Sequence, residues 1–208
     1  MKDEIKILRI EALHESCWTE KTDNFDVKVQ TIYEDFPNME VYNSQLLVWG
    51  KDSKKFIKMI KSNVYIVNTF GEELKLINCI CRRDNTISDI VKKYQGTILS
   101  QYNFEGTEYW KILIKNNVID KFRERLEEIS HIKGFQVTDL TSFSPFPELT
   151  NIQKKIIIKA FSKGYYSFPK NANAREISKE LGISPVTFIY HLRKAERNII
   201  KHYLNNAW

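Results

Sequence analysis

The stretch NAREISKELGISPVTFIYHLRKAERNIIKHYL, residues 173–204, decides the fold of the C-terminal part of the chain. Residues 173–176 carry an asparagine followed three positions later by an acid, which is the capping pattern that opens a helix. Gly182 then supplies a turn, and Ser184 with Pro185 opens a second helix, with proline at its favoured first position. A short helix, a tight glycine turn and a longer helix are typical of a helix-turn-helix.

The second helix, residues 184–204, has two different faces when it is projected at about 100° per residue. The residues expected to face the core are Phe188, Leu192, Ala195 and Ile199. The opposite face is basic with one aromatic residue, so we expect it to enter the major groove of DNA. The predicted DNA-contacting residues on this helix are Pro185, Val186, Thr187, Tyr190, Arg193, Lys194 and Arg197, and those before it are Lys170 and Arg175.

The predicted contacts differ in what they read. Arg193 has two interpretations, a bidentate contact to a guanine edge and a phosphate contact. Lys170, Arg175, Lys194 and Arg197 are phosphate candidates, with an ordinary solvated charge as the alternative for each. Tyr190 is assigned either to a sugar or thymine methyl group, or to packing within the protein.

The basic charge of the chain is concentrated at its C-terminal end. Residues 150–208 contain 11 Lys and Arg against 3 Asp and Glu, a net charge of +8, whereas residues 1–149 have a net charge of −2. Basic groups that neutralise phosphates gain affinity from counterion release, so this asymmetry favours a nucleic-acid partner. A lysine-rich solvated surface is the alternative interpretation.

The C-terminal segment also resembles a known family. Thr150 and Gln153 form a capping box in the run LTNIQ, GYYSFP follows, and LGIS and HLRKAE close the pattern. This combination resembles the archaeal bacterio-opsin-activator type helix-turn-helix domain, over about a quarter of the chain. The resemblance implies sequence-specific DNA binding in an archaeon. Tyr190 and Val186 depart from the family's usual residues, which leaves the base preference open.

The N-terminal region, residues 1–140, reads as strands interleaved with short helices. From Leu74 onward the order is strand, helix, strand, strand, helix, strand, which is the ferredoxin-like arrangement that ACT-like modules share. The preceding strands and the helix near residues 53–61 have room for a second, partial copy, although the sequence shows no clear repeat. We therefore predict an α+β fold: a sensor or dimerisation domain over 1–140, a linker over 141–148, and an all-α helix-turn-helix domain over 149–208.

Other classes of protein find little support. The apolar runs are too short to cross a bilayer and no signal-peptide stretch opens the chain, so a cytoplasmic protein is expected. No phosphate-binding loop, HExxH motif or GxSxG elbow occurs, and neither an enzyme nor a cofactor is predicted. His14 with Cys17 and Cys79 with Cys81 offer two pairs of zinc-type ligands, but their spacing is not a recognised motif, and no metal site is assigned.

The sequence thus predicts a transcriptional regulator that reads duplex DNA with the helix 184–204. One such helix contacts few base pairs, so a homodimer is expected, held by the N-terminal sheet or by the segment 199–208. The N-terminal region is assigned either to a small-molecule effector or to docking on a basal transcription factor. The alternatives are a partner-docking transcription cofactor without a ligand and a non-specific DNA-binding protein.

Overall fold

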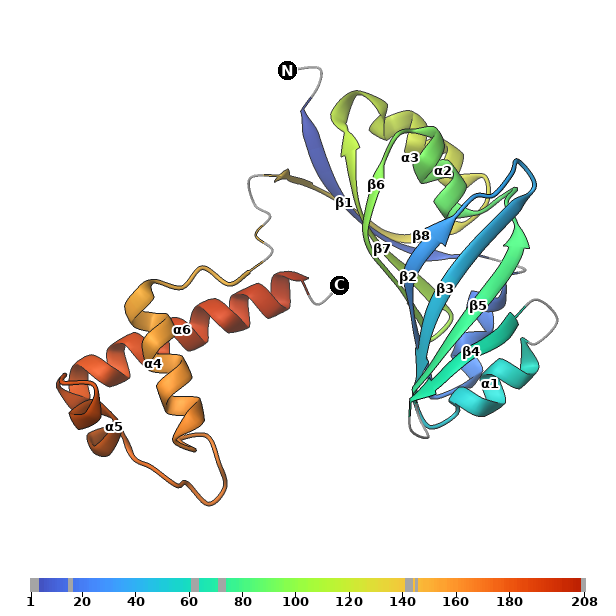
Figure 1. Cartoon of the computed structure of the whole chain (residues 1–208). Coiled ribbons are helices and arrows are strands. Elements are labelled where there is room, and N and C mark those ends of the chain that lie inside the picture. The colour runs from blue at the N-terminus through green and yellow to red at the C-terminus, as the bar shows by residue number, and fades with distance from the viewer. Residues whose placement is uncertain are drawn as a thin grey trace. The chain divides into compact units, whose positions relative to one another are not determined.

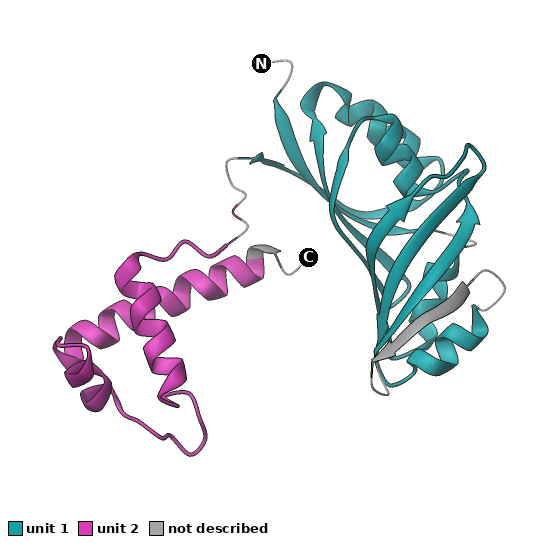
Figure 2. Cartoon of the chain, viewed as in Figure 1, with its two compact units in different colours: residues 1–142 teal, residues 143–208 magenta. Residues whose placement is uncertain are grey.

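The computed structural model describes residues 4–14, 17–60, 64–70, 74–140, 144 and 146–206, with only the backbone described at 64–70 and 205–206. The chain divides into two units, Met1–Ser142 and Phe143–Trp208, coloured separately in Figure 2. Within the described ranges, none of the helices combines the length and the apolar character needed to cross a membrane.

The first unit is built on one eight-stranded antiparallel sheet (Figure 1). Its strands lie in the order β4-β5-β3-β2-β6-β7-β1-β8. The strand bounds are β1 Ile5–Leu13, β2 Lys28–Asp35, β3 Val41–Trp49, β4 Val64–Phe70, β5 Leu74–Arg82, β6 Thr97–Phe104, β7 Thr107–Lys115 and β8 His131–Asp139.

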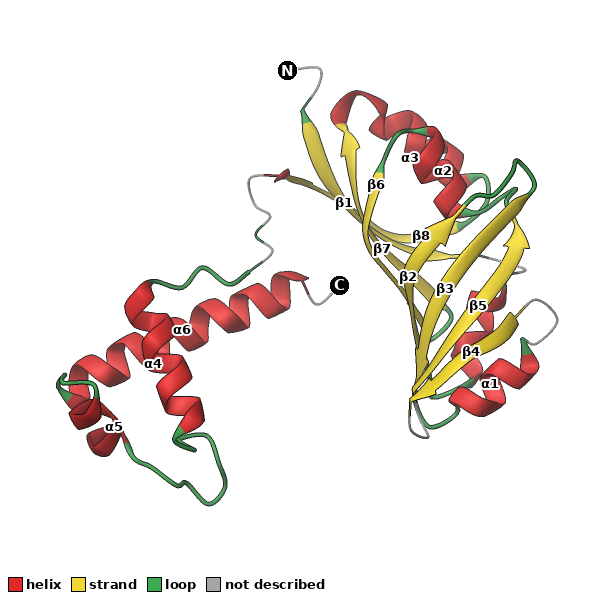
Figure 3. Cartoon of the chain, viewed as in Figure 1, coloured by secondary structure: helices red, strands yellow, loops and turns green. Residues whose placement is uncertain are grey.

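Short helices accompany the sheet and divide its core into two clusters (Figure 3). Phe122 and Leu126 of α3 pack in the cluster formed with β1, β7 and α2, whereas Phe56 of α1 packs in the cluster formed with β2, β3 and β5. The helix bounds are η1 Trp18–Asn24, α1 Ser53–Met59, α2 Ile87–Lys93, η3 Asn116–Val118 and α3 Ile119–Glu127.

The first unit contains the same order of elements twice, apart from η3, which precedes α3 in the second copy alone. The first copy is β1-η1-β2-β3-α1-β4, and the second is β5-α2-β6-β7-α3-β8. The first strands of the two copies are exchanged: β1 lies between β7 and β8 of the second copy, and β5 lies between β3 and β4 of the first. The strand order is therefore symmetric about the contact between β2 and β6: β3, β5 and β4 follow on one side, and β7, β1 and β8 follow on the other. The first unit is an α+β fold whose two halves are interlocked by this exchange.

Both core clusters lie on the same face of the sheet. Val29 on β2 is directly opposite Asn103 on β6, and residues that oppose each other across a ladder project from the same face. Val29 belongs to the cluster around Phe56. Asn103 is buried on the same face of the sheet as Trp110, which belongs to the cluster around Phe122. The seam between the halves is thus an interior region containing polar side chains.

Three features of the first unit and the linker differ from the sequence-based expectation. Gly134 is expected from the sequence just beyond a helix end, where a left-handed residue is needed, but it lies within β8, opposite Glu11. The helix η1, which begins at Trp18, was not predicted, because its sequence is short and mostly polar. The two phenylalanines of the linker, Phe143 and Phe146, are expected from their apolar side chains to pack against a surface. Phe146 is instead 75% exposed, and Phe143 lies outside the described residues.

The second unit contains α4 Asn151–Ser162, α5 Ala174–Glu180 and α6 Pro185–Asn206. Both predicted capping boxes are formed, at Thr150 before α4 and at Asn173 before α5. The three helices share one apolar core, and its fully buried members are Ile156, Ala160, Ile177, Phe188 and Leu192.

Candidate nucleic-acid interface

The turn between α5 and α6 sets the direction of α6. Gly182 has a φ of +66°, a left-handed conformation that favours glycine, and it ends α5. Ser184 then caps α6, since its Oγ accepts a hydrogen bond from the backbone N–H of Thr187 at 3.0 Å. Phe188 and Leu192 anchor the inner face of α6 in the core. These contacts leave the opposite face of the first turns open to solvent.

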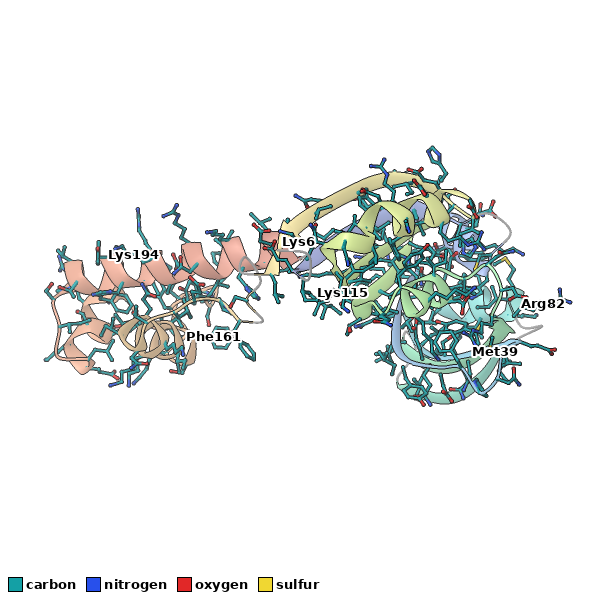
Figure 4. All side chains as sticks on the ribbon, turned by 90° about the horizontal axis from the view of Figure 1, so that it is seen from above. Lys6, Met39, Arg82, Lys115, Phe161 and Lys194 are labelled. Atoms are coloured by element: carbon teal, nitrogen blue, oxygen red, sulfur yellow. The ribbon has the colours of Figure 1, made fainter. Side chains whose placement is uncertain are left out.

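The exposed face of α6 carries the residues that the sequence assigns to DNA. Val186 is 79% and Tyr190 53% exposed, and the Nζ atom of Lys194 lies 4.5 Å from the centre of the Tyr190 ring. Figure 4 shows Lys194 on the side of α6 away from the other two helices of the unit. Exposed residues of this surface, named here the α6 basic face, are Pro185, Val186, Thr187, Tyr190, Arg193, Lys194 and Arg197.

None of the three acidic residues of the segment 150–208, all of which the structure describes, forms an ion pair with this face, and each has a partner elsewhere. Glu176 accepts a hydrogen bond from the backbone N–H of Asn173 in the α5 capping box. Glu180 forms ion pairs with two lysines of the α4 region, Lys159 and Lys163, at 2.7 and 2.8 Å. Glu196 accepts a hydrogen bond from the hydroxyl of Tyr166. The positive charge of α6 therefore faces solvent without an acidic partner from this segment.

Two further predicted residues lie before α6. Lys170 is exposed in the loop after α4, with its Nζ atom 4.7 Å from the centre of the Tyr165 ring. The Tyr165 ring in turn contacts Phe188 in an edge-to-face arrangement, so this loop is held against the start of α6. Arg175 is exposed in the first turn of α5. Lys170 thus lies on a loop that packs on α6, and Arg175 lies on α5, the first helix of the helix-turn-helix.

The C-terminal end of α6 exposes apolar side chains. Ile200 is 57%, Tyr203 67% and Leu204 67% exposed within the second unit. Asn198, one turn earlier, donates a hydrogen bond from its side chain to the backbone oxygen of Glu148 at 2.7 Å, which holds the start of the unit against α6. Trp208, the last residue of the chain, lies outside the described residues.

The first unit contains a large cleft where β2 and β6 separate. These strands are paired only at Val29 and Gln30, and the space beyond is a cavity of about 590 Å³. Glu34 lines it, and burial raises the pKa of this carboxyl even though Tyr42 and Ser88 donate hydrogen bonds to it. The volume is in the range of small-molecule sites.

A second group of reactive side chains lies at the seam between the halves. One donor atom each from His14, Cys17 and Glu108 lies within 4.8 Å of the others. Burial disfavours the charged form of His14, but hydrogen bonds with Cys17 and Glu108 outweigh it and raise the pKa of His14 to about 10. Sequence spacing suggested His14 and Cys17 as a pair, but it gave no signal for Glu108, which is distant in the chain.

The geometry of the second unit defines a helix-turn-helix DNA-binding module. Residues 149–201 match the family model described as "HTH DNA binding domain", which confirms the resemblance seen in the sequence. A similar protein is a candidate transcriptional regulator of Haloferax volcanii, 38% identical over 58 residues. That match covers 28% of this chain and 10% of the relative, so the similarity concerns the DNA-binding domain.

Proposed function

We propose that the protein is a sequence-specific transcriptional regulator that places the recognition helix, residues 184–204, in the major groove of duplex DNA. The observation that carries this proposal is the α6 basic face, which projects away from the core and has no acidic partner within its own segment. A helix of a helix-turn-helix reads bases mainly from its first turns.

The residues divide into two roles. Val186, Thr187, Tyr190 and Arg193 are on the first turns of α6 and are assigned to the groove. Arginine can contact a guanine edge with two hydrogen bonds, and this is the role proposed for Arg193, with a phosphate contact as the alternative. The phosphate contacts are assigned to Lys170, Arg175, Lys194 and Arg197, with Pro185 at the groove entrance.

The N-terminal region, residues 1–140, is proposed as the sensing and dimerisation part, joined by the linker 141–148 to the DNA-binding domain at 149–208. We interpret its duplicated element order as two ferredoxin-like units with exchanged first strands. The cleft of about 590 Å³ between β2 and β6 is the proposed place for a small-molecule effector. A homodimer on a repeated half-site would double the contacts that one recognition helix makes.

The experiment that tests the proposal is selection of duplexes from random DNA by the full chain, followed by binding measurements over a salt series. Arg193→Ala is expected to cost about 1–3 kcal/mol and to relax specificity at one base position. Lys194→Ala is expected to weaken binding to all sequences alike and to reduce the logarithmic salt slope by about 1.

Lys163→Ala is the matched control for Lys194→Ala, because Lys163 is paired with Glu180. It should leave both the selected motif and the salt slope unchanged. If no motif is selected, and Lys194→Ala behaves like Lys163→Ala, the protein is not a sequence-specific regulator that uses this face.

A further inference from the structure

The fold brings His14, Cys17 and Glu108 together at the seam. Ala12 on β1 is directly opposite Glu108 on β7, and side chains two residues apart along a strand project from the same face. His14, just beyond the end of β1, therefore approaches Glu108, and its Nδ1 atom lies 3.4 Å from Oε1 of the carboxylate. Cys17 follows at the start of η1.

We propose that His14, Cys17 and Glu108 form a binding site for a divalent transition-metal ion, with Zn²⁺ as the expected occupant. An imidazole nitrogen, a thiolate and a carboxylate are all zinc ligands, with bonds of about 2.0–2.3 Å. Around a tetrahedral ion such bonds place ligand atoms about 3.5 Å apart. The three donor atoms all lie within 4.8 Å of one another, so small side-chain movements reach that arrangement. Binding also releases the ligand protons, because zinc takes a neutral imidazole and a thiolate.

The neighbours of Glu108 already hold its carboxylate in one orientation. The hydroxyl of Thr19 donates a hydrogen bond to Oε1 at 2.8 Å, and the indole N–H of Trp110 donates one to Oε2 at 2.9 Å. Metal-bound carboxylates characteristically have such outer partners, which fix the ligand before the ion arrives. Within the described part of the chain, the only basic side chain that pairs with Glu108 is His14 itself.

The site also has space for an ion and for a further ligand. His14, Cys17 and Glu108 line a cavity of about 50 Å³, to which Cys81 also contributes. A water molecule occupies about 30 Å³ in the liquid, so the cavity accommodates a metal ion with one open coordination position. Three protein ligands with an open fourth position are a common arrangement for zinc.

The duplication provides an internal comparison. Arg83 follows β5 as His14 follows β1, and Thr86 is the N-cap of α2 as Cys17 is the N-cap of η1. Tyr42 on β3 is the equivalent of Glu108 on β7. Tyr42 is opposite Cys81, two residues before Arg83, and Glu108 is opposite Ala12, two residues before His14. The second copy thus has a guanidinium, a hydroxyl and a phenol at these positions. Because the second copy folds with non-ligating side chains at these positions, the fold itself does not require metal ligands there. Of the two equivalent positions, the one formed by His14, Cys17 and Glu108 carries the zinc-type donor set.

The test uses the full chain without DNA, so that its outcome is independent of the proposed DNA binding. Chelator-treated protein is equilibrated with Zn²⁺, and bound metal per chain is measured by mass spectrometry. Co²⁺ is then titrated as a spectroscopic probe, because a thiolate bound to Co²⁺ gives a charge-transfer band. We expect one metal ion per chain and a thiolate band.

Four variants locate the site. Cys17→Ser should abolish the thiolate band, and Thr19→Val, which removes a hydrogen bond that orients Glu108, should weaken Zn²⁺ binding about 10- to 100-fold. Cys79→Ser and His131→Gln, which change another thiol and another imidazole, should leave stoichiometry and spectrum unchanged.

Two results would overturn the proposal. One is a substoichiometric metal content in the wild-type chain, and the other is a Co²⁺ thiolate band that survives in Cys17→Ser. The wild-type stoichiometry and the Thr19→Val affinity keep the test decisive even if Cys17→Ser does not fold.

Discussion

Replacing Asp89 with asparagine should destabilise the first unit by about 3 kcal/mol at neutral pH. Its carboxylate is buried and forms ion pairs with Nε of Arg83 at 2.6 Å and with Nζ of Lys93 at 2.7 Å. Breaking a buried ion pair typically costs about 3–5 kcal/mol, since the remaining charge loses its partner. The lower end of this range applies because Lys93 is half exposed and can be hydrated once its partner is lost. Of the two cations, Arg83 is then the largely buried one that keeps an unpaired charge.

The loss should depend on pH in a defined direction. Burial alone raises the pKa of Asp89, but Lys93 and Arg83 outweigh it and hold the pKa of this carboxyl below its usual value. A carboxyl whose pKa is lowered by folding adds stability above its unfolded pKa and loses it as the pH falls through the folded pKa. The stability difference between wild type and Asp89→Asn should therefore be full at pH 7 and shrink below about pH 4.

Urea denaturation of the full chain, followed by tryptophan fluorescence, measures this effect, because three of the four tryptophans are Trp18, Trp49 and Trp110 of the first unit. With an m-value of about 2 kcal/mol/M, a loss of about 3 kcal/mol lowers the midpoint by about 1.5 M. Glu127→Gln is the control, because its ion pair with Arg123 is half exposed and worth about 0.5 kcal/mol or less. Equal midpoints for the two variants would refute the reasoning.

Two further predictions concern the second unit. Gly182→Ala should cost about 1–2 kcal/mol in thermal unfolding followed by circular dichroism, because a Cβ there meets no atom within 4 Å and only the left-handed backbone opposes it. Gly182→Asn should be nearly neutral, and an equal cost for both would exclude this explanation. Tyr203→Glu is expected to convert a dimer into a monomer in sedimentation velocity, if the exposed apolar end of α6 holds two copies together, whereas Lys201→Glu should not. A wild-type chain that sediments as a monomer would contradict the dimer outright.

The helix-turn-helix was predictable because its signals are local. Capping boxes at Thr150 and Asn173, the glycine of the turn and the Ser184-Pro185 start each act within four residues, and the structure forms all of them. The inner residues of α6 followed from helical periodicity: Phe188, Leu192 and Ala195 are buried. Which exposed residues touch DNA stays a prediction, because exposure identifies a surface without a partner.

The first unit was predictable only in its element order. The strands and the helices α1, α2 and α3 have local apolar patterns, whereas η1 has a mostly polar sequence and was missed. Strand exchange has no local signal, because β1 and β5 carry similar apolar runs. Pairing is decided by packing of the whole sheet, which places Ile10 against Trp110 and Ile77 against Leu46.

The strand exchange also explains why the seam is the place where a ligand would act on the whole first unit. By strand pairing β1 belongs to one half, whereas η1 belongs by element order to the other; His14 follows β1 and Cys17 precedes η1. Glu108 belongs to β7 in one half, while Trp18, next to Cys17, packs on Phe56 in the other. An ion bound by Cys17 and Glu108 would therefore tie the two halves together directly. If the metal proposal holds, Zn²⁺ at 100 times its Kd stabilises the unit by about 2.7 kcal/mol, and this gain disappears in Cys17→Ser.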